Sequence, residues 1–103
     1  MGEIANRRMF RVLKQQKFAE QLRDLIETHP RLEELEKAID WTLSRRPDQN
    51  AFPMGDGYYL WITDQLPGNI IPVVRILYRI EEYRRTVSLC RIEIYKNVDT
   101  TLQ

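Results

Sequence analysis

The chain has 103 residues, of which 43% are hydrophobic and 30% charged, and it contains few glycines and prolines. This composition is typical of a folded domain and excludes a largely disordered or low-complexity chain. The net charge of +1 neither requires nor excludes a nucleic-acid partner, and no apolar run is long enough to cross a bilayer, so no membrane partner is expected.

A single cysteine, Cys90, cannot form an internal disulfide, which fits a reducing compartment, and we expect a cytoplasmic protein. With one cysteine and one histidine, His29, the sequence offers no Cys/His metal site, so we expect neither metal nor cofactor. The length predicts one domain over residues 1–103, with 1–8 and 97–103 as frayed ends.

Charge is distributed unevenly along the chain. Residues 17–40 carry four basic and seven acidic side chains, a net charge of −3, whereas the rest carries twelve basic and eight acidic ones, a net charge of +4. The charge separation is mild, but it can steer a phosphate-rich partner toward one face of the protein.

Residues 9–14 come first among the predicted elements. Phe10 and Val12 alternate with Arg11 as in a half-buried strand, and we predict a strand here, partly from the resemblance described below, although a helix is also compatible with this pattern. Two amphipathic helices follow: one over residues 17–29, and one that begins at Pro30. Their apolar stripes are formed by Phe18, Leu22, Leu25 and Ile26, and by Leu32, Leu35, Ala38, Ile39 and Leu43.

After a polar loop over residues 45–57, residues 58–63 are rich in aromatic and β-branched side chains and predict a strand. Residues 65–72 predict a long loop, which either covers the polar face of the sheet or extends an edge strand for a partner. Residues 73–80 and 86–95 predict a β-hairpin joined by a charged turn.

Strict alternation assigns the two faces of this hairpin. Val74, Ile76, Tyr78 and Ile80 share one face of the first strand, opposite Arg75 and Arg79. On the second strand, one row is Ser88, Cys90, Ile92 and Ile94, and the other is Val87, Leu89, Arg91, Glu93 and Tyr95. The element order β-α-α-β-β-β predicts an α+β fold, with a helical hairpin packed on one face of a small, mostly antiparallel sheet.

The hairpin motifs resemble those of the RelE/ParE toxin superfamily of type II toxin–antitoxin systems. The resemblance covers roughly residues 10–95 and is carried by Val74-Arg75-Ile76-Leu77-Tyr78-Arg79-Ile80 and Cys90-Arg91-Ile92-Glu93-Ile94-Tyr95. It implies a cognate antitoxin protein as partner. It also implies one of two targets, since members either cut messenger RNA in the ribosome, as mRNA interferases that inhibit translation, or inhibit DNA gyrase.

The polar row suggests a candidate catalytic set for RNA cleavage, which needs a base, an acid and cations for the phosphate. Arg75 and Arg91 would bind the phosphate, with Glu93 as base and Tyr95 as acid. Tyr59, Trp61 and Arg79 would contact RNA, the two aromatic side chains by stacking on bases.

Each of these residues also has a structural interpretation. The charged pairs can form a cross-strand ion-pair ladder, and Tyr59, Trp61 and Tyr95 can be packing aromatics. Cys90 is most simply a buried small residue, and His29 a helix-end residue. A second basic patch, or else an ordinary solvated surface, is formed by Arg7, Arg8, Arg11, Arg45 and Arg46.

Two functional hypotheses therefore remain open. The first is a RelE-like toxin that acts on RNA in the translating ribosome. The second is a non-catalytic interaction module, either a ParE-like gyrase binder or a relative whose polar face only docks an antitoxin. Neither hypothesis predicts the oligomeric state.

Overall fold

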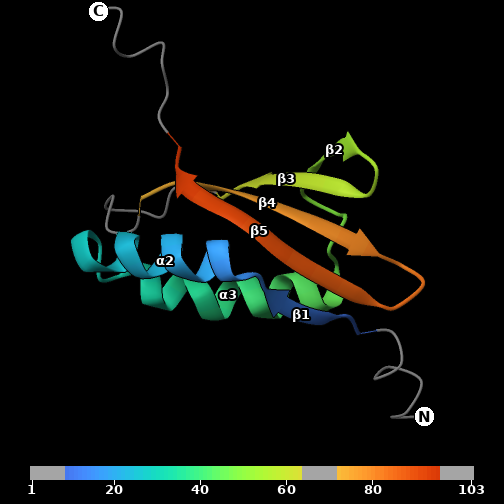
Figure 1. Ribbon diagram of the computed structural model, residues 1–103, viewed down its shortest axis with the longest axis horizontal. Helices are drawn as coiled ribbons and strands as arrows, with labels where there is room; N and C mark the ends of the chain where they lie inside the picture. Colours follow the sequence, from blue (N-terminus) through green and yellow to red (C-terminus); the bar gives the residue numbers. More distant parts are fainter. Residues whose placement is uncertain (1–8, 64–71, 96–103) are drawn as a thin grey trace, which may run out of the picture.

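The computed structural model describes residues 9–63 and 72–95, so the predicted frayed ends and the loop at 65–72, except Pro72, lie outside the described residues. Two helices cover one face of a five-stranded sheet and leave the other face open (Figure 1). The elements in chain order are β1 Arg11–Lys14, α2 Gln16–Thr28, α3 Leu32–Arg45, β2 Phe52–Gly55, β3 Tyr58–Ile62, β4 Val74–Glu81 and β5 Thr86–Ile94. The predicted α+β class is confirmed.

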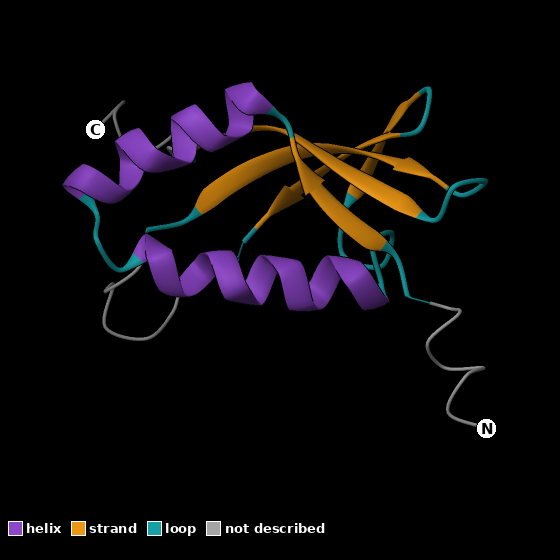
Figure 2. Cartoon of the chain, turned by 60° about the horizontal axis from the view of Figure 1, so that its bottom comes forward, coloured by secondary structure: helices purple, strands orange, loops and turns teal. Residues whose placement is uncertain are grey.

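The helical hairpin forms because each helix has one apolar stripe to bury. α2 ends at Thr28, before Pro30, and α3 begins two residues after that proline. Glu33 and Glu34 lie in the first turn of α3, where carboxylates stabilise the positive end of the helix dipole. Both helices lie on the same side of the sheet (Figure 1), and Figure 2 shows that they run in opposite directions. Their buried side chains are Phe18, Leu22, Leu32, Ile39 and Leu43.

The strand order is β1-β5-β4-β3-β2, with β1 parallel to β5 and the other neighbours antiparallel. The sequence predicts a loop over residues 45–57 and misses β2, because Pro53 and Gly55 are poor strand formers. Pairing with β3 holds this short edge strand. The turn between them has positive φ at three successive residues, Gly55, Asp56 and Gly57, a conformation that two glycines make accessible.

A β-bulge in β5 changes the predicted faces of that strand. Tyr78 pairs with Leu89 and Leu77 with Arg91, so Cys90 has no partner residue in β4. A bulge inserts one residue and shifts the side-chain alternation beyond it. The predicted rows are therefore wrong: Val87 and Leu89 before the bulge face the helices, and so does Ile92 after it.

The core lies between the helices and the inward side chains of β4 and β5. Tyr78 is its largest fully buried residue, and its hydroxyl donates a hydrogen bond to the carbonyl oxygen of Pro47, which ties the sheet to the chain after α3. Burial raises the pKa of Tyr78 well above its ordinary value, with a smaller contribution from Asp48. The phenol is a neutral structural donor and takes no part in a polar site.

Candidate functional site

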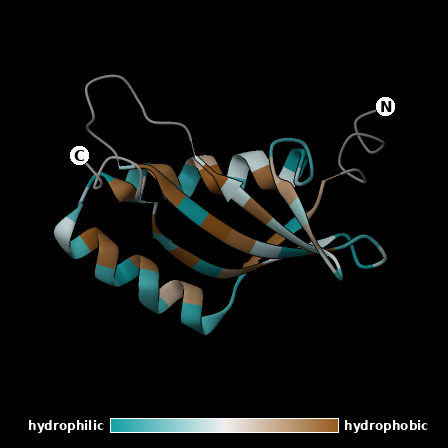
Figure 3. Ribbon diagram, turned by 90° about the horizontal axis from the view of Figure 1, so that it is seen from above, coloured by the Kyte–Doolittle hydropathy of each residue, from teal (hydrophilic) through white to brown (hydrophobic). Residues whose placement is uncertain are grey.

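The open face of the sheet carries the candidate site. Along β4 the outward side chains are Arg75, Leu77 and Arg79, which alternate with buried residues as predicted. Figure 3 shows the alternation of hydrophilic and hydrophobic residues along the strands. Strand pairing places β5 residues beside them: Glu93 opposite Arg75, and Arg91 opposite Leu77. The structure therefore brings Arg75, Arg91 and Glu93 onto one face.

Arg75 and Glu93 form a direct cross-strand ion pair. Nε and Nη2 of Arg75 both donate to Oε2 of Glu93, while both side chains stay about half exposed. An exposed pair of this kind contributes only about 0–1 kcal/mol to stability. The contacts use one carboxylate oxygen, so Oε1 of Glu93 is available to a further hydrogen-bond donor.

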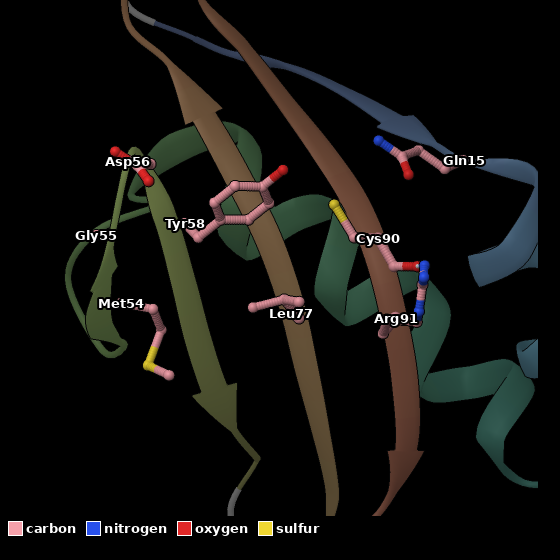
Figure 4. A pocket seen from close by; sticks show the side chains of 8 residues that line it. All are labelled: Gln15, Met54, Gly55, Asp56, Tyr58, Leu77, Cys90 and Arg91. Atoms are coloured by element: carbon pink, nitrogen blue, oxygen red, sulfur yellow. Dashed lines mark hydrogen bonds between the residues drawn. The ribbon is translucent and has the colours of Figure 1, made fainter.

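Arg91 lies beside this pair at the edge of a cleft of about 450 Å³. Its Nη1 donates to the carbonyl oxygen of Cys90 at 2.9 Å, and within residues 9–63 and 72–95 it has no ion pair. Figure 4 shows the cleft, with β2, β3, β4 and β5 contributing its walls. The lining residues are Gln15, Met54, Gly55, Asp56, Tyr58, Leu77, Cys90 and Arg91.

Cys90 is buried, with 6% of its surface exposed, yet the bulge turns it toward the cleft and away from the helix-covered core. Its Sγ donates to the carbonyl oxygen of Ser88 at 3.4 Å. Burial raises the pKa of the thiol, only partly opposed by Arg91. A neutral thiol is a poor nucleophile, so the site has a cation and no activated cysteine.

Tyr59 and Trp61 do not reach this face. They pair with Tyr78 and Ile76 on the inward side of the sheet, are partly buried against the core, and Tyr59 stacks on Tyr78 with 6.0 Å between ring centroids. Both side chains therefore lie apart from Arg75 and Arg91, in the position that the packing alternative describes.

Tyr58 is the outward aromatic residue that sequence reasoning missed. It pairs with Arg79, whose guanidinium carbon lies 5.8 Å from the Tyr58 ring centroid. Both rows of β3 are apolar, so alternation alone gives no signal for choosing between them. Only the register with β4 shows that Tyr58 shares a face with the arginines.

Tyr95 follows the last residue of β5, where its backbone N–H donates to the carbonyl oxygen of Val73 at 2.8 Å. Its side chain is 39% exposed. Arg79 makes an ion pair with Glu81, at 3.2 Å. These two side chains lie toward opposite ends of the candidate face, with Arg75, Arg91 and Glu93 between them.

The remaining sequence candidates have local partners. The guanidinium of Arg45 lies 4.3 Å from the Trp41 ring centroid, and Arg46 donates to Gln49. Arg7 and Arg8 lie outside the described residues.

Acidic, histidine and cysteine side chains are spread over the described part of the chain. Within it, no group of three or more of them is placed to hold a metal ion. Neither of the helices described is long and apolar enough to span a membrane.

Solved structures share this arrangement. The chain superposes on a chain of the toxin–antitoxin complex RelBE2 from Mycobacterium tuberculosis with a TM-score of 0.67 and 21% identity, covering 84% of this chain and 99% of that one. It superposes on a mutant of the E. coli toxin RelE in the free state with a TM-score of 0.61 and 14% identity, covering 91% and 92%.

A conserved hypothetical protein from Helicobacter pylori gives a TM-score of 0.55 at 16% identity, covering 84% of this chain and 96% of the other. No family model matches the sequence, and no curated protein matches it significantly. The molecule therefore has the α+β fold of the RelE toxins.

Proposed function

We propose that the chain is a RelE/ParE-superfamily toxin of a type II toxin–antitoxin system, which cuts messenger RNA in the translating ribosome. The observation that carries the proposal is the juxtaposition of Arg75, Arg91 and Glu93 on the open face of a RelE-like fold. Tyr58, Arg79 and Tyr95 extend the same face and complete a surface for single-stranded RNA.

In this proposal cleavage proceeds through the 2′-hydroxyl of the RNA. Glu93 accepts the hydroxyl proton while the 2′-oxygen attacks phosphorus. Arg75 and Arg91 stabilise the negative charge that develops on the phosphate oxygens. Tyr95 donates a proton to the departing 5′-oxygen, which leaves a cyclic phosphate on one fragment. Arg79 and Tyr58 bind the neighbouring nucleotide, the tyrosine by stacking on its base.

A cognate antitoxin is the proposed protein partner. The M. tuberculosis structure with this fold is a toxin–antitoxin complex. An antitoxin that covers the open face would block Arg75 and Arg91 from RNA. The proposed location is the cytoplasm, where translating ribosomes are found.

The test is induced expression in bacteria, followed by mapping of RNA ends. The wild type is expected to arrest growth and to produce cuts linked to codon position. Glu93→Gln and Arg91→Ala are each expected to lower cleavage by about 100-fold or more, the scale of acid–base and electrostatic contributions. Matched substitutions on exposed α2 positions, Glu20→Gln and Arg23→Ala, should leave cleavage unchanged. Growth arrest with intact messenger RNA would contradict the proposal.

The Arg75–Glu93 ion pair favours a second candidate function. In a non-catalytic cross-strand ladder each carboxylate is paired with a guanidinium, as Glu93 is with Arg75. In that case the face is a docking surface, for an antitoxin or for DNA gyrase as in ParE-like proteins. Blocked supercoiling in a gyrase assay with intact messenger RNA would support this candidate. Expression without any growth defect would contradict both toxic functions.

A further inference from the structure

A second cleft of about 470 Å³ lies on the open face, where β1 meets β5 and the β4–β5 turn begins. Three arginines line it: Arg11 from β1, and Arg84 and Arg85 from the turn. The one acidic residue in its lining, Glu81, makes an ion pair with Arg79. The cleft is thus positively charged, and it takes no part in the cleavage proposed above.

The turn holds its arginines in place through backbone contacts. Arg84 and Arg85 donate their N–H groups to the carbonyl oxygens of Glu81 and Glu82, and the carbonyl oxygen of Arg85 accepts the N–H of Arg11 at 2.8 Å. Arg85 adopts a positive φ of 53°, and its guanidinium carbon lies 4.3 Å from the Phe10 ring centroid. Backbone contacts therefore hold the two segments that carry these arginines side by side, and the Phe10 ring positions the guanidinium of Arg85.

Donor groups remain available for an anion. Nε of Arg85 is buried with no hydrogen-bond partner among the described residues, while Nη1 of the same side chain lies 3.9 Å from Oε1 of Glu82. Arg11 and Arg84 are exposed, and within the described ranges neither makes an ion pair. Guanidinium groups bind phosphate oxygens through paired N–H donors, which suits this set to a phosphate group.

We propose that this cleft, lined by Arg11, Arg84 and Arg85, is a phosphate-binding subsite for single-stranded RNA that extends from the candidate catalytic face. It deepens the proposed function and depends on it, since RNA is the ligand. Ser88 of the cleft pairs with Arg79 and Arg91 pairs with Leu77, so the two lie two β4 residues apart, about 7 Å at roughly 3.3 Å per residue. One RNA strand can therefore contact both places.

Tyr83, at the tip of the same turn, favours RNA over an acidic peptide. Its side chain is 99% exposed, although burial of such a ring is normally favourable. An exposed aromatic ring beside arginines is the usual platform for an unpaired base, which stacks on the ring while the cations bind the backbone. An acidic peptide would use the arginines and leave Tyr83 without a role.

The test measures binding of a short, fluorescein-labelled 2′-O-methyl RNA, which cannot be cleaved, by fluorescence anisotropy over a range of salt concentrations. The double variant Arg11→Gln/Arg84→Gln should weaken binding about tenfold. It should also lower the slope of log K against log salt by about 0.7 for each phosphate that the variant no longer neutralises. Tyr83→Ala should weaken binding at least about fivefold.

A charge-matched control on exposed positions of α2, Lys17→Gln/Arg23→Gln, should change affinity less than about twofold, and thermal unfolding checks that each variant is folded. Arg84→Lys, which keeps the positive charge, should have the same slope of log K against log salt as the wild type. The subsite is overturned if the double variant binds RNA as tightly as the wild type does. It is also overturned if the double variant weakens the binding of an acidic peptide but not that of RNA. If RNA binding depends on these arginines but messenger RNA stays intact in cells, the subsite stands and the proposed cleavage fails.

Discussion

Cys90 and Arg91 are neighbours that line the same cleft but carry different chemistry. The bulge at Cys90 lets two successive side chains approach one face of the sheet. Arg91 is exposed and keeps its charge, whereas burial disfavours the thiolate of Cys90. At the residue scale, the site can stabilise an anion, and it has no thiolate nucleophile.

Alkylation of Cys90 by iodoacetamide tests this assignment. Because burial raises the pKa of the thiol, the folded protein should react more slowly at pH 7–8 than the chain unfolded in urea. The pH at which the alkylation rate is half of its maximum should also be higher for the folded protein than for the unfolded chain. Since the folded state holds this proton more tightly, the thiol's contribution to stability is complete below the unfolded pKa and is lost as pH rises through the folded pKa. Equal rates in both states would contradict a buried neutral thiol.

Strand β5 is the element on which the site depends. A regular strand with its observed residues would point either Leu89 or Ile92 into solvent, because the two are an odd number of positions apart. The bulge resolves this conflict by burying both, at 0% and 1% exposed. The same insertion leaves Arg91 and Glu93 on the open face beside Arg75.

Alanine substitutions along β5 test the bulge, because they show which side chains of the strand are buried. Leu89→Ala and Ile92→Ala should each lower the free energy of unfolding by about 2–5 kcal/mol, since both remove packed core methyl groups. Arg91→Ala, between them, should change it by about 0.5 kcal/mol or less. Urea unfolding monitored by tryptophan fluorescence gives all three values. If only one of the two apolar substitutions were costly, β5 would be a regular strand.

The whole molecule is divided into a helix-covered face and an open face. Burial is concentrated in β4 and β5 at the centre of the sheet, whereas every residue of the edge strand β2 is exposed. An edge strand with little buried apolar surface opens locally without unfolding of the core. Motion is therefore expected first at the β2 wall of the cleft that holds Arg91.

Amide hydrogen exchange followed by NMR checks this gradient of stability. Amides of β4 and β5 should exchange only through global unfolding, whereas those of β2 should exchange at least about tenfold faster. Addition of uncleavable RNA should slow exchange in β2 if the strand closes on ligand. Equal protection of β2 and β4 would contradict a locally mobile wall.

Most of the fold could be predicted from local patterns. The apolar stripes of α2 and α3 and the alternation in β4 depend on residues a few positions apart, and those predictions are confirmed, except that Ala38 of the α3 stripe is exposed. β2 could not be predicted, because Pro53 and Gly55 do not favour a strand and only pairing with β3 holds it in one. For the candidate site, Arg75 and Arg91 share a face as expected, whereas Tyr59 and Trp61 do not.

The sequence by itself determined the two helices, the strands β3, β4 and β5, and which residues of β4 are polar, because these features depend on local side-chain pattern and composition. Tertiary structure alone decided the bulge at Cys90, the outward position of Tyr58 and the gathering of Arg11 with Arg84 and Arg85. Each of these depends on the register between paired strands. Register is set by burying the largest apolar area of the whole sheet against the helices, a quantity that no single segment contains.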